Sequence, residues 1–380
     1  MKLRYIANLG IALLAIAISA IAMENGLIYA ARSGWISVDL NPMSGFWADI
    51  NPDFGVWHRA NTTFDHLAPC FHVSYTANSY GAVDKERTPR SGDSRVVVLG
   101  DSMMEGYSLN RQDRLSDRLE QKTGVEYMNF ATAQGFGPIQ YMLMYETMAG
   151  KFDHDAVLVG FLPENDFTDS DWEIGQKVFY NRYRPYFVRN GGKLELIHFS
   201  EAFLETSQKP KHWYLAPFDY LWNDTMTFRT ARKAYSLYRY QTMVDNKIVR
   251  DAWALTPKVR SFYYDYSPAD LEMAKVALAR LVKSANGRPV VVIGIPMLRD
   301  LMNFKERGAP PFTADMEKMG REAGFQFVDL LPEFAKKEDS WSSFYHSCDH
   351  HWTPMANAYA AEIIAPVMEQ AVIKGRSTVR

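Results

Sequence analysis

The chain has little cysteine and little net charge. Only Cys70 and Cys348 occur among 380 residues, so at most one disulfide can form, and the sequence leaves open whether the two pair or stay as buried thiols. The formal net charge of −2 excludes the strongly basic footprint of a nucleic-acid-binding protein. No internal repeat is visible. With 47% hydrophobic and 23% charged residues, the composition is that of a globular protein with room for a substantial core and for two domains.

The N-terminus carries a long apolar run. Residues 6–23 are almost wholly apolar and follow a short basic segment, residues 1–4. This run is about long enough to span a bilayer, and the basic residues before it favour a cytoplasmic N-terminus. Residues 1–33 are therefore expected to be a signal peptide cleaved near Ala22 or, as we favour, a retained anchor. A buried helix fits less well, because the run lacks a polar face. The rest of the chain is expected on the periplasmic side of the inner membrane, anchored or secreted.

From Arg95 onward, short apolar runs alternate with helical stretches. The predicted strands cover residues 95–99, 125–130, 156–161, 289–295 and 325–330. The predicted helices cover residues 109–123, 138–149, 268–285, 313–323 and 353–372. Continuous apolar strands that are each followed by a helix indicate an α/β fold with a parallel five-stranded sheet between two helical layers.

Two regions do not follow this alternation. Residues 34–94 are rich in Trp, Phe, Pro, Asn and Gly, which predicts an irregular or short-stranded extension. Residues 167–267 are too long for a plain loop, so they are expected to be an insertion within a domain of residues 95–380. The aromatic residues of this insertion are expected to form a small core of their own or, alternatively, stacking surfaces for a sugar chain. They include Trp172, Tyr180, Tyr183, Tyr186, Phe187, Trp213, Tyr214, Tyr220 and Trp222.

The tripeptide Gly-Asp-Ser occurs twice, on either side of the first predicted strand. Ser94 precedes the strand, whereas Ser102 follows it directly. Ligands of parallel sheets bind beyond the carboxyl ends of the strands, so Ser102 is the candidate nucleophile and residues 91–94 are expected to be a turn. A serine hydroxyl is a poor nucleophile without a base.

The base is expected in the segment Cys348-Asp349-His350-His351-Trp352, just before the last predicted helix. This segment would lie at the same sheet edge as Ser102, and Asp349 could fix the tautomer of a neighbouring histidine. The alternative is a metal site made by His346, Cys348, Asp349, His350 and His351. The sequence has no second group of ligand residues at a spacing typical of metal sites.

Four blocks, in this order, resemble the SGNH/GDSL hydrolase superfamily from about Arg95 to the last helix. They are Val98-Leu99-Gly100-Asp101-Ser102, residues 129–137 (NFATAQGFG), residues 160–166 (GFLPEND) and Asp349-His350-His351-Trp352. The last block resembles the Asp-x-His-Trp form found in proteins similar to alginate O-acetyltransferases.

The resemblance implies a flavodoxin-like SGNH hydrolase fold and assigns roles to single residues. It implies Ser102 as nucleophile, Asp349 as the acid and His351 as base, with His350 as the alternative base. The oxyanion would be bound by the backbone amides of Ser102 and Gly135, Gly137 being less favoured, and by the side chain of Asn165. Asn165 and the two glycines could instead be ordinary capping and turn residues.

The expected activity is acyl transfer from an ester, without metal or cofactor. Water as acceptor makes an esterase, and a sugar hydroxyl makes an O-acetyltransferase. An exported enzyme suggests O-acetylated cell-wall or exopolysaccharide glycan, or a small ester, as substrate, and a transferase could receive its acyl group from a membrane partner. The rivals are a lipase or lysophospholipase, and a glycan-binding component of an export complex whose site is unused.

Overall fold

The computed structural model describes residues 2–41, 45–133, 135–172, 184–198, 214, 216–244 and 261–379. The chain forms two compact units. Residues 1–43, 66–72 and 210–249 form the first, called the helical unit below, and residues 44–65, 73–209 and 250–380 form the second, called the sheet unit.

A five-stranded parallel sheet is the centre of the sheet unit. Its strands are β5 (Arg95–Leu99), β6 (Glu126–Asn129), β7 (Ala156–Phe161), β10 (Val290–Gly294) and β11 (Gln326–Asp329). They lie in the order β11-β10-β7-β5-β6, and all neighbouring strands are parallel. This is the doubly wound, flavodoxin-like order, and its switch point, where ligands bind in such sheets, lies where β5 meets β7. The predicted fold class is confirmed.

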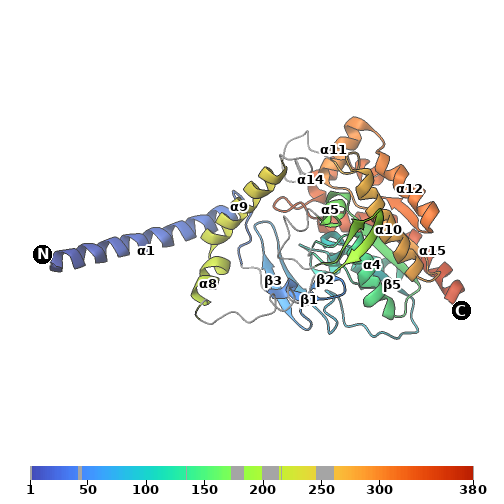
Figure 1. Ribbon diagram of the computed structural model, residues 1–380, viewed down its shortest axis with the longest axis horizontal. Coiled ribbons are helices and arrows are strands. Elements are labelled where there is room, and N and C mark those ends of the chain that lie inside the picture. Colours follow the sequence, from blue (N-terminus) through green and yellow to red (C-terminus); the bar gives the residue numbers. More distant parts are fainter. Residues whose placement is uncertain are drawn as a thin grey trace. The chain divides into compact units, whose positions relative to one another are not determined.

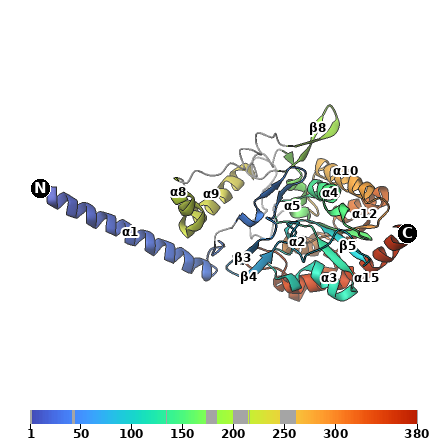
Figure 2. The same cartoon turned by 90° about the horizontal axis from the view of Figure 1, so that it is seen from below.

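Helices cover both faces of this sheet (Figures 1 and 2). On one face α3 (Leu115–Thr123) packs against α15 (Pro354–Val379), and on the other α10 (Pro268–Ser284) packs against α4 (Pro138–Thr147) and α12 (Pro311–Ala323). Each of these helices was predicted, but α3 begins at Leu115 rather than near residue 109. The reason is that Arg114 is extended behind a short 3-10 turn, Arg111–Asp113.

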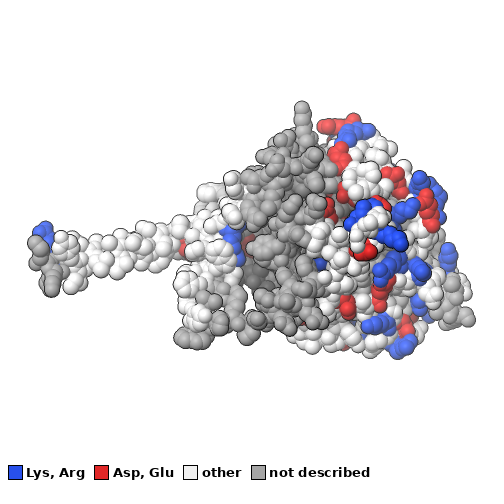
Figure 3. Space-filling model, viewed as in Figure 1, with Lys and Arg blue, Asp and Glu red and all other residues white. Residues whose placement is uncertain are grey.

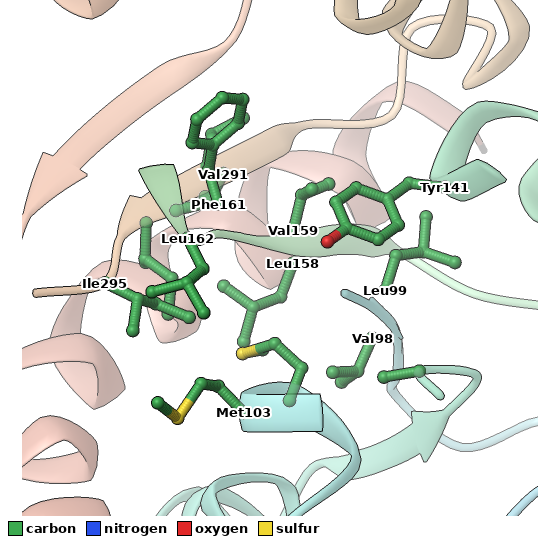
Figure 4. Packing of buried hydrophobic residues seen from close by; sticks show 14 of the residues in the cluster. Val98, Leu99, Met103, Tyr141, Leu158, Val159, Phe161, Leu162, Val291 and Ile295 are labelled. Atoms are coloured by element: carbon green, nitrogen blue, oxygen red, sulfur yellow. The ribbon is translucent and has the colours of Figure 1, made fainter. Parts of the chain in front are cut away.

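The core explains why the strands read as unbroken apolar runs. Every residue of β5, β7 and β10 is buried. Figure 4 shows Val98 and Leu99 of β5 in one cluster with Leu158, Val159 and Met103, the residue after Ser102. The candidate nucleophile therefore directly follows a strand that is buried along its whole length.

The sheet unit also contains short elements that were not among the predicted strands and helices. They are α2 (Ser102–Glu105), α5 (Pro163–Asp169), α11 (Leu298–Arg307), α13 (Leu331–Ala335) and α14 (Trp341–Phe344), and the hairpin of β8 (Tyr186–Asn190) with β9 (Lys193–Ile197).

The segment before β5 contains short strands. A 3-10 turn, Gly45–Trp47, precedes the antiparallel pair β1 (Asp49–Asn51) and β2 (Gly55–Trp57). A second two-stranded sheet pairs β3 (Thr63–Leu67) with β4 (His72–Thr76).

The helical unit contains α1 (Lys2–Arg32), α8 (Ala216–Asp224) and α9 (Met226–Val244). By length and composition, α1 could cross a membrane, although signal sequences pass the same test. Ala31 at the end of α1 is buried with Val38 and with Met226 at the start of α9, so these helices share a small core.

The aromatic residues of the predicted insertion do not all form a core. Tyr186 and Phe187 are buried, but Tyr214, Tyr220 and Trp222 are about half or more exposed. The expectation of a common core is wrong for these three residues, because they lie on the outside of the helical unit. Tyr180, Tyr183 and Trp213 lie outside the described residues.

Candidate active site

Ser102 lies in a tight turn at the carboxyl end of β5, where it is the first residue of α2. Asp101 precedes it as the N-cap, and its carboxylate accepts a hydrogen bond from the Met103 amide at 3.0 Å. Gly100 is required here, because a Cβ would lie 2.6 Å from the Cβ of Met104. The turn thus holds the Ser102 side chain at the carboxyl edge of the sheet, next to the point where the strand order reverses.

The segment that carries the two adjacent histidines is a loop fixed at both ends. Tyr345 and Trp352 form a β-bridge across it, and the His346 amide donates to the His351 carbonyl at 2.8 Å. The Tyr345 hydroxyl donates to the Pro296 carbonyl, just beyond β10, at 2.9 Å. Trp352 is buried and stacks on Phe334 at a centroid distance of 5.1 Å. These contacts bind the loop to the carboxyl ends of the strands.

The structure brings Ser102, His351 and Asp349 together. His351 Nε2 lies 2.8 Å from Ser102 Oγ. His351 Nδ1 lies 3.2 Å from Asp349 Oδ2, a close ion-pair contact rather than a well-aligned hydrogen bond. Asp349 Oδ1 also accepts from the His351 amide at 3.1 Å. The order nucleophile, base and orienting carboxylate is that of a serine-hydrolase triad, and such contacts are often loose before substrate binds.

Charge around His351 favours its protonated form. Burial by itself would lower the pKa of His351, but the adjacent Asp349 carboxylate raises it above the usual value, helped by Asp101 and Glu105. Burial acts in the opposite direction on Asp349, yet His351 lowers the pKa of this carboxyl. The pair is therefore suited to hold a proton on His351 while Asp349 stays ionised.

The alternative residues are placed differently. His350 has a left-handed backbone, φ 63°, and its pKa is lowered by burial. The base contact to Ser102 comes from His351 and not from this neighbour. Ser94 precedes β5 at the opposite edge of the sheet, where its carbonyl accepts from the Glu126 amide at 3.0 Å.

The proposed oxyanion donors lie on the segments that follow β6 and β7. Gly135 has φ 70° and lies so close to Arg184 that a Cβ would contact the guanidinium at 2.7 Å. The Gly137 amide donates to Gln140 Oε1 at 3.2 Å in the capping box of α4. Gly137 is thus engaged in a helix cap, which leaves Gly135 as the better candidate of the two.

Asn165, on α5, contacts the residue next to the nucleophile. Its Nδ2 donates to Asp101 Oδ2 at 2.9 Å. An amide nitrogen carries two hydrogens, so the second N–H remains available for a substrate oxygen. Burial raises the pKa of Asp101 to about 6, against the effect of the hydrogen bonds from Asn165 and Met103.

A second histidine–carboxylate pair involves Glu105, the last residue of α2, and the sequence did not reveal it. Glu105 and His58 are fully buried, with Oε1 and Nε2 3.5 Å apart. Glu105 also accepts hydrogen bonds from Trp47 Nε1 at 3.2 Å and from the Ala133 amide. Ala133 belongs to the segment that contains Gly135, so Glu105 ties that segment to α2. The position of Glu105, one helical turn after Ser102, was the available signal, but nothing marks His58 or Trp47.

The sequence left open the state of the two cysteines and offered a metal site as an alternative. Neither Cys70 nor Cys348 is a free thiol. Within the described part of the chain, no group of three or more His, Cys, Asp and Glu side chains is arranged to hold a metal ion.

Comparison with known proteins returned structures only. No protein-family model matches the chain, and no curated protein matches it. The solved structures that it resembles include a lipase/acylhydrolase from Enterococcus faecalis, with 12% identity over 74% of this chain and 96% of that one at a TM-score of 0.37. A member of the lipolytic G-D-S-L family from Veillonella parvula has 9% identity, coverage of 72% and 97%, and a TM-score of 0.38. A carbohydrate esterase family 2 enzyme with a carbohydrate-binding domain, from Corynascus thermopiles, has 13% identity, coverage of 76% and 69%, and a TM-score of 0.38.

Proposed function

We propose that this chain is a serine ester hydrolase of the SGNH/GDSL superfamily. The observation that carries the proposal is the row of three side chains in which Ser102 Oγ lies 2.8 Å from His351 Nε2, and His351 Nδ1 lies 3.2 Å from Asp349. The three residues come from the turn after β5 and from the loop before α15. They meet at the sheet edge where α/β enzymes bind their ligands.

In the proposed reaction, Ser102 Oγ attacks the ester carbonyl while its proton passes to His351 Nε2. His351 then returns that proton to the departing alcohol, which leaves an acyl group on Ser102. Water or a sugar hydroxyl then attacks the acyl group while its proton passes to His351. His351 gives this proton to Ser102 Oγ, which frees the serine. Asp349 stays ionised throughout, holds the ring and stabilises the imidazolium.

The developing negative charge on the carbonyl oxygen would be bound by three donors. The Ser102 amide is one of the first-turn groups that a helix leaves without an intrahelical partner. The Gly135 amide and the second Nδ2 hydrogen of Asn165 would complete the set. Each such donor is typically worth about 10²–10³ in rate.

The finer part of the proposal is an O-acyl group on an exported polysaccharide, with water or a sugar hydroxyl as the acceptor. Its support is the apolar N-terminal helix, which is compatible with export.

The two Gly-Asp-Ser copies provide the test of the nucleophile. Ser102→Ala is expected to abolish turnover of p-nitrophenyl acetate and labelling by a fluorophosphonate probe, whereas Ser94→Ala, the matched control, keeps both. Peptide mapping of the labelled protein should place the adduct on Ser102. Equal loss in both variants, or an unlabelled wild-type chain, would contradict the proposal and favour a binding protein with an unused site. Mass spectrometry of acetylated glycans then separates release from transfer.

A further inference from the structure

Large exposed side chains, most of them aromatic, lie on α8 and α9 of the helical unit. On α8, Phe218, Leu221 and Trp222 are exposed at a spacing of three and four residues, so they share one face. On α9, Phe228, Tyr235 and Tyr238 follow at helical spacing and are also exposed. Phe218 is 70% and Tyr238 is 64% exposed. Large apolar side chains gathered in this way mark a surface that meets another phase or partner. These six residues are called the aromatic face.

The start of α9 is fixed to one point on α1. The Glu24 carboxylate accepts hydrogen bonds from the amides of Met226 and Thr227, at 2.5 and 2.9 Å, and from the Thr227 hydroxyl at 2.7 Å. Arg229, one turn further on, donates to the carbonyls of Asp39 and Leu40, just beyond α1. Helices α1 and α9 are therefore joined by polar contacts as well as by the small core of Ala31, Val38 and Met226.

The point of attachment lies at the end of the membrane-length segment of α1. Between Arg4 and Glu24 the sequence has no charged residue, and the apolar side chains of this stretch are exposed. Figure 3 shows this part of α1 as a stretch without charge. At 1.5 Å per residue, such a stretch is about as long as the ~30 Å hydrocarbon core of a bilayer. If α1 spans the membrane, Glu24 and the start of α9 lie at its outer border.

We infer that the aromatic face is seated in the lipid headgroup region of the membrane that α1 crosses. Tyr and Trp concentrate at this depth, because each has an apolar body and a polar tip. Similar side chains lie near the end of α1, where the exposed rings of Tyr29, on α1, and Trp35, just beyond it, pack edge to face at 5.7 Å. Amphipathic helices with such a face lie in the interface plane. The aromatic face and the exposed rings near the end of α1 would then both face lipid, independent of the chemistry at Ser102.

Depth-dependent quenching in the full-length protein tests this inference. Phe218→Cys and Tyr235→Cys, each labelled with an environment-sensitive NBD group without reductant, are reconstituted into phosphatidylcholine vesicles. Lys233→Cys is the matched control, because Lys233 is exposed on the same helix but about 160° around the axis from Tyr235 at 100° per residue. Lipids with a doxyl group near the headgroup should remove most of the NBD fluorescence at residues 218 and 235 and little at 233, where aqueous iodide should quench instead.

Two results would overturn the inference. Quenching at residues 218 and 235 by iodide rather than by doxyl lipid would place the aromatic face in water. Protection from both quenchers would mean that protein covers it, either a second copy of the chain or another partner. Retained esterase activity in the labelled variants shows that the fold is intact, and its presence or absence in wild type is decided separately by the Ser102 experiment.

Discussion

Two histidine–carboxylate pairs lie near α2, and they differ in the groups that their imidazole rings contact. His351 touches Asp349 on one side and the Ser102 hydroxyl on the other, and both members of this pair keep about a fifth of their side-chain surface exposed. His58 is fully buried, and both of its nitrogens meet protein groups: Nδ1 lies 2.7 Å from the Gly81 carbonyl, and Nε2 lies near Thr132 and Glu105. His58 thus contacts a hydroxyl too, that of Thr132, so the two pairs differ in solvent access. The His351–Asp349 pair, the proposed proton relay, is partly exposed, and the His58–Glu105 pair, which we call the clamp, is fully buried.

The largest effect is expected from removing the ring of the exposed pair. His351→Gln should lower kcat for p-nitrophenyl acetate on the order of 10⁶-fold, because among the described residues only His351 Nε2 lies within hydrogen-bond distance of Ser102 Oγ. His350→Gln is the matched control, since it changes the adjacent histidine without touching Ser102, and should stay within about tenfold of wild type. A comparable loss in the His350 variant would mean that the two rings exchange roles.

The second largest loss of kcat is expected from replacing Asp349, and it should also change the pH dependence of the activity. Asp349→Asn should lower kcat about 10⁴-fold. The base must be neutral, so activity falls as the pH drops through the pKa of His351. Because Asp349 raises that pKa, the acid limb of the wild-type profile should lie above the pH expected for an isolated histidine, and the variant's limb should move to lower pH. An acid limb that does not move would show that Asp349 does not act through His351.

The smallest kinetic effect is expected at the buried pair. Glu105→Gln turns an acceptor of the Trp47 and Ala133 N–H groups into a partial donor, which should cost about 1–3 kcal/mol of unfolding free energy in urea titrations. Its kcat should stay within about tenfold of wild type. Glu146→Gln, which breaks a more exposed pair with Arg280, is the control and should cost less than about 1 kcal/mol. If Glu105→Gln lowered kcat as much as Asp349→Asn, the buried pair would take part in the reaction and would not be only structural.

The contrast between the pairs also explains what the sequence could predict. Strands such as Ala156–Phe161 were predicted to the residue, because a strand buried on both faces leaves an unbroken apolar run. Ser102 and the Asp349–His351 loop could be placed at one sheet edge, because each stands directly beside a predicted element. His58 and Glu105 meet through the folding of an irregular segment, for which no local period exists. The contacts among Ser102, His351 and Asp349 were therefore predictable, and those between His58 and Glu105 were not.

Boundaries failed where local backbone geometry overrides periodicity. The expected helix from residue 109 starts at Leu115, since Arg114 is extended and buried with its guanidinium donating to the Val83 carbonyl at 2.6 Å. The aromatic residues after residue 210 were expected to be a core because aromatics usually are. Their exposure follows from the helical unit, whose small core is built from Ala31, Val38 and Met226 instead.

The Glu24 cap has a mechanical consequence. A single carboxylate on α1 holds two successive amides at the beginning of α9, so turning α1 about its own axis must carry α9 with it. The N-terminal helix therefore does not act as a free swivel for the helices attached to it. The orientation of α1 about its own axis therefore also determines the orientation of α9.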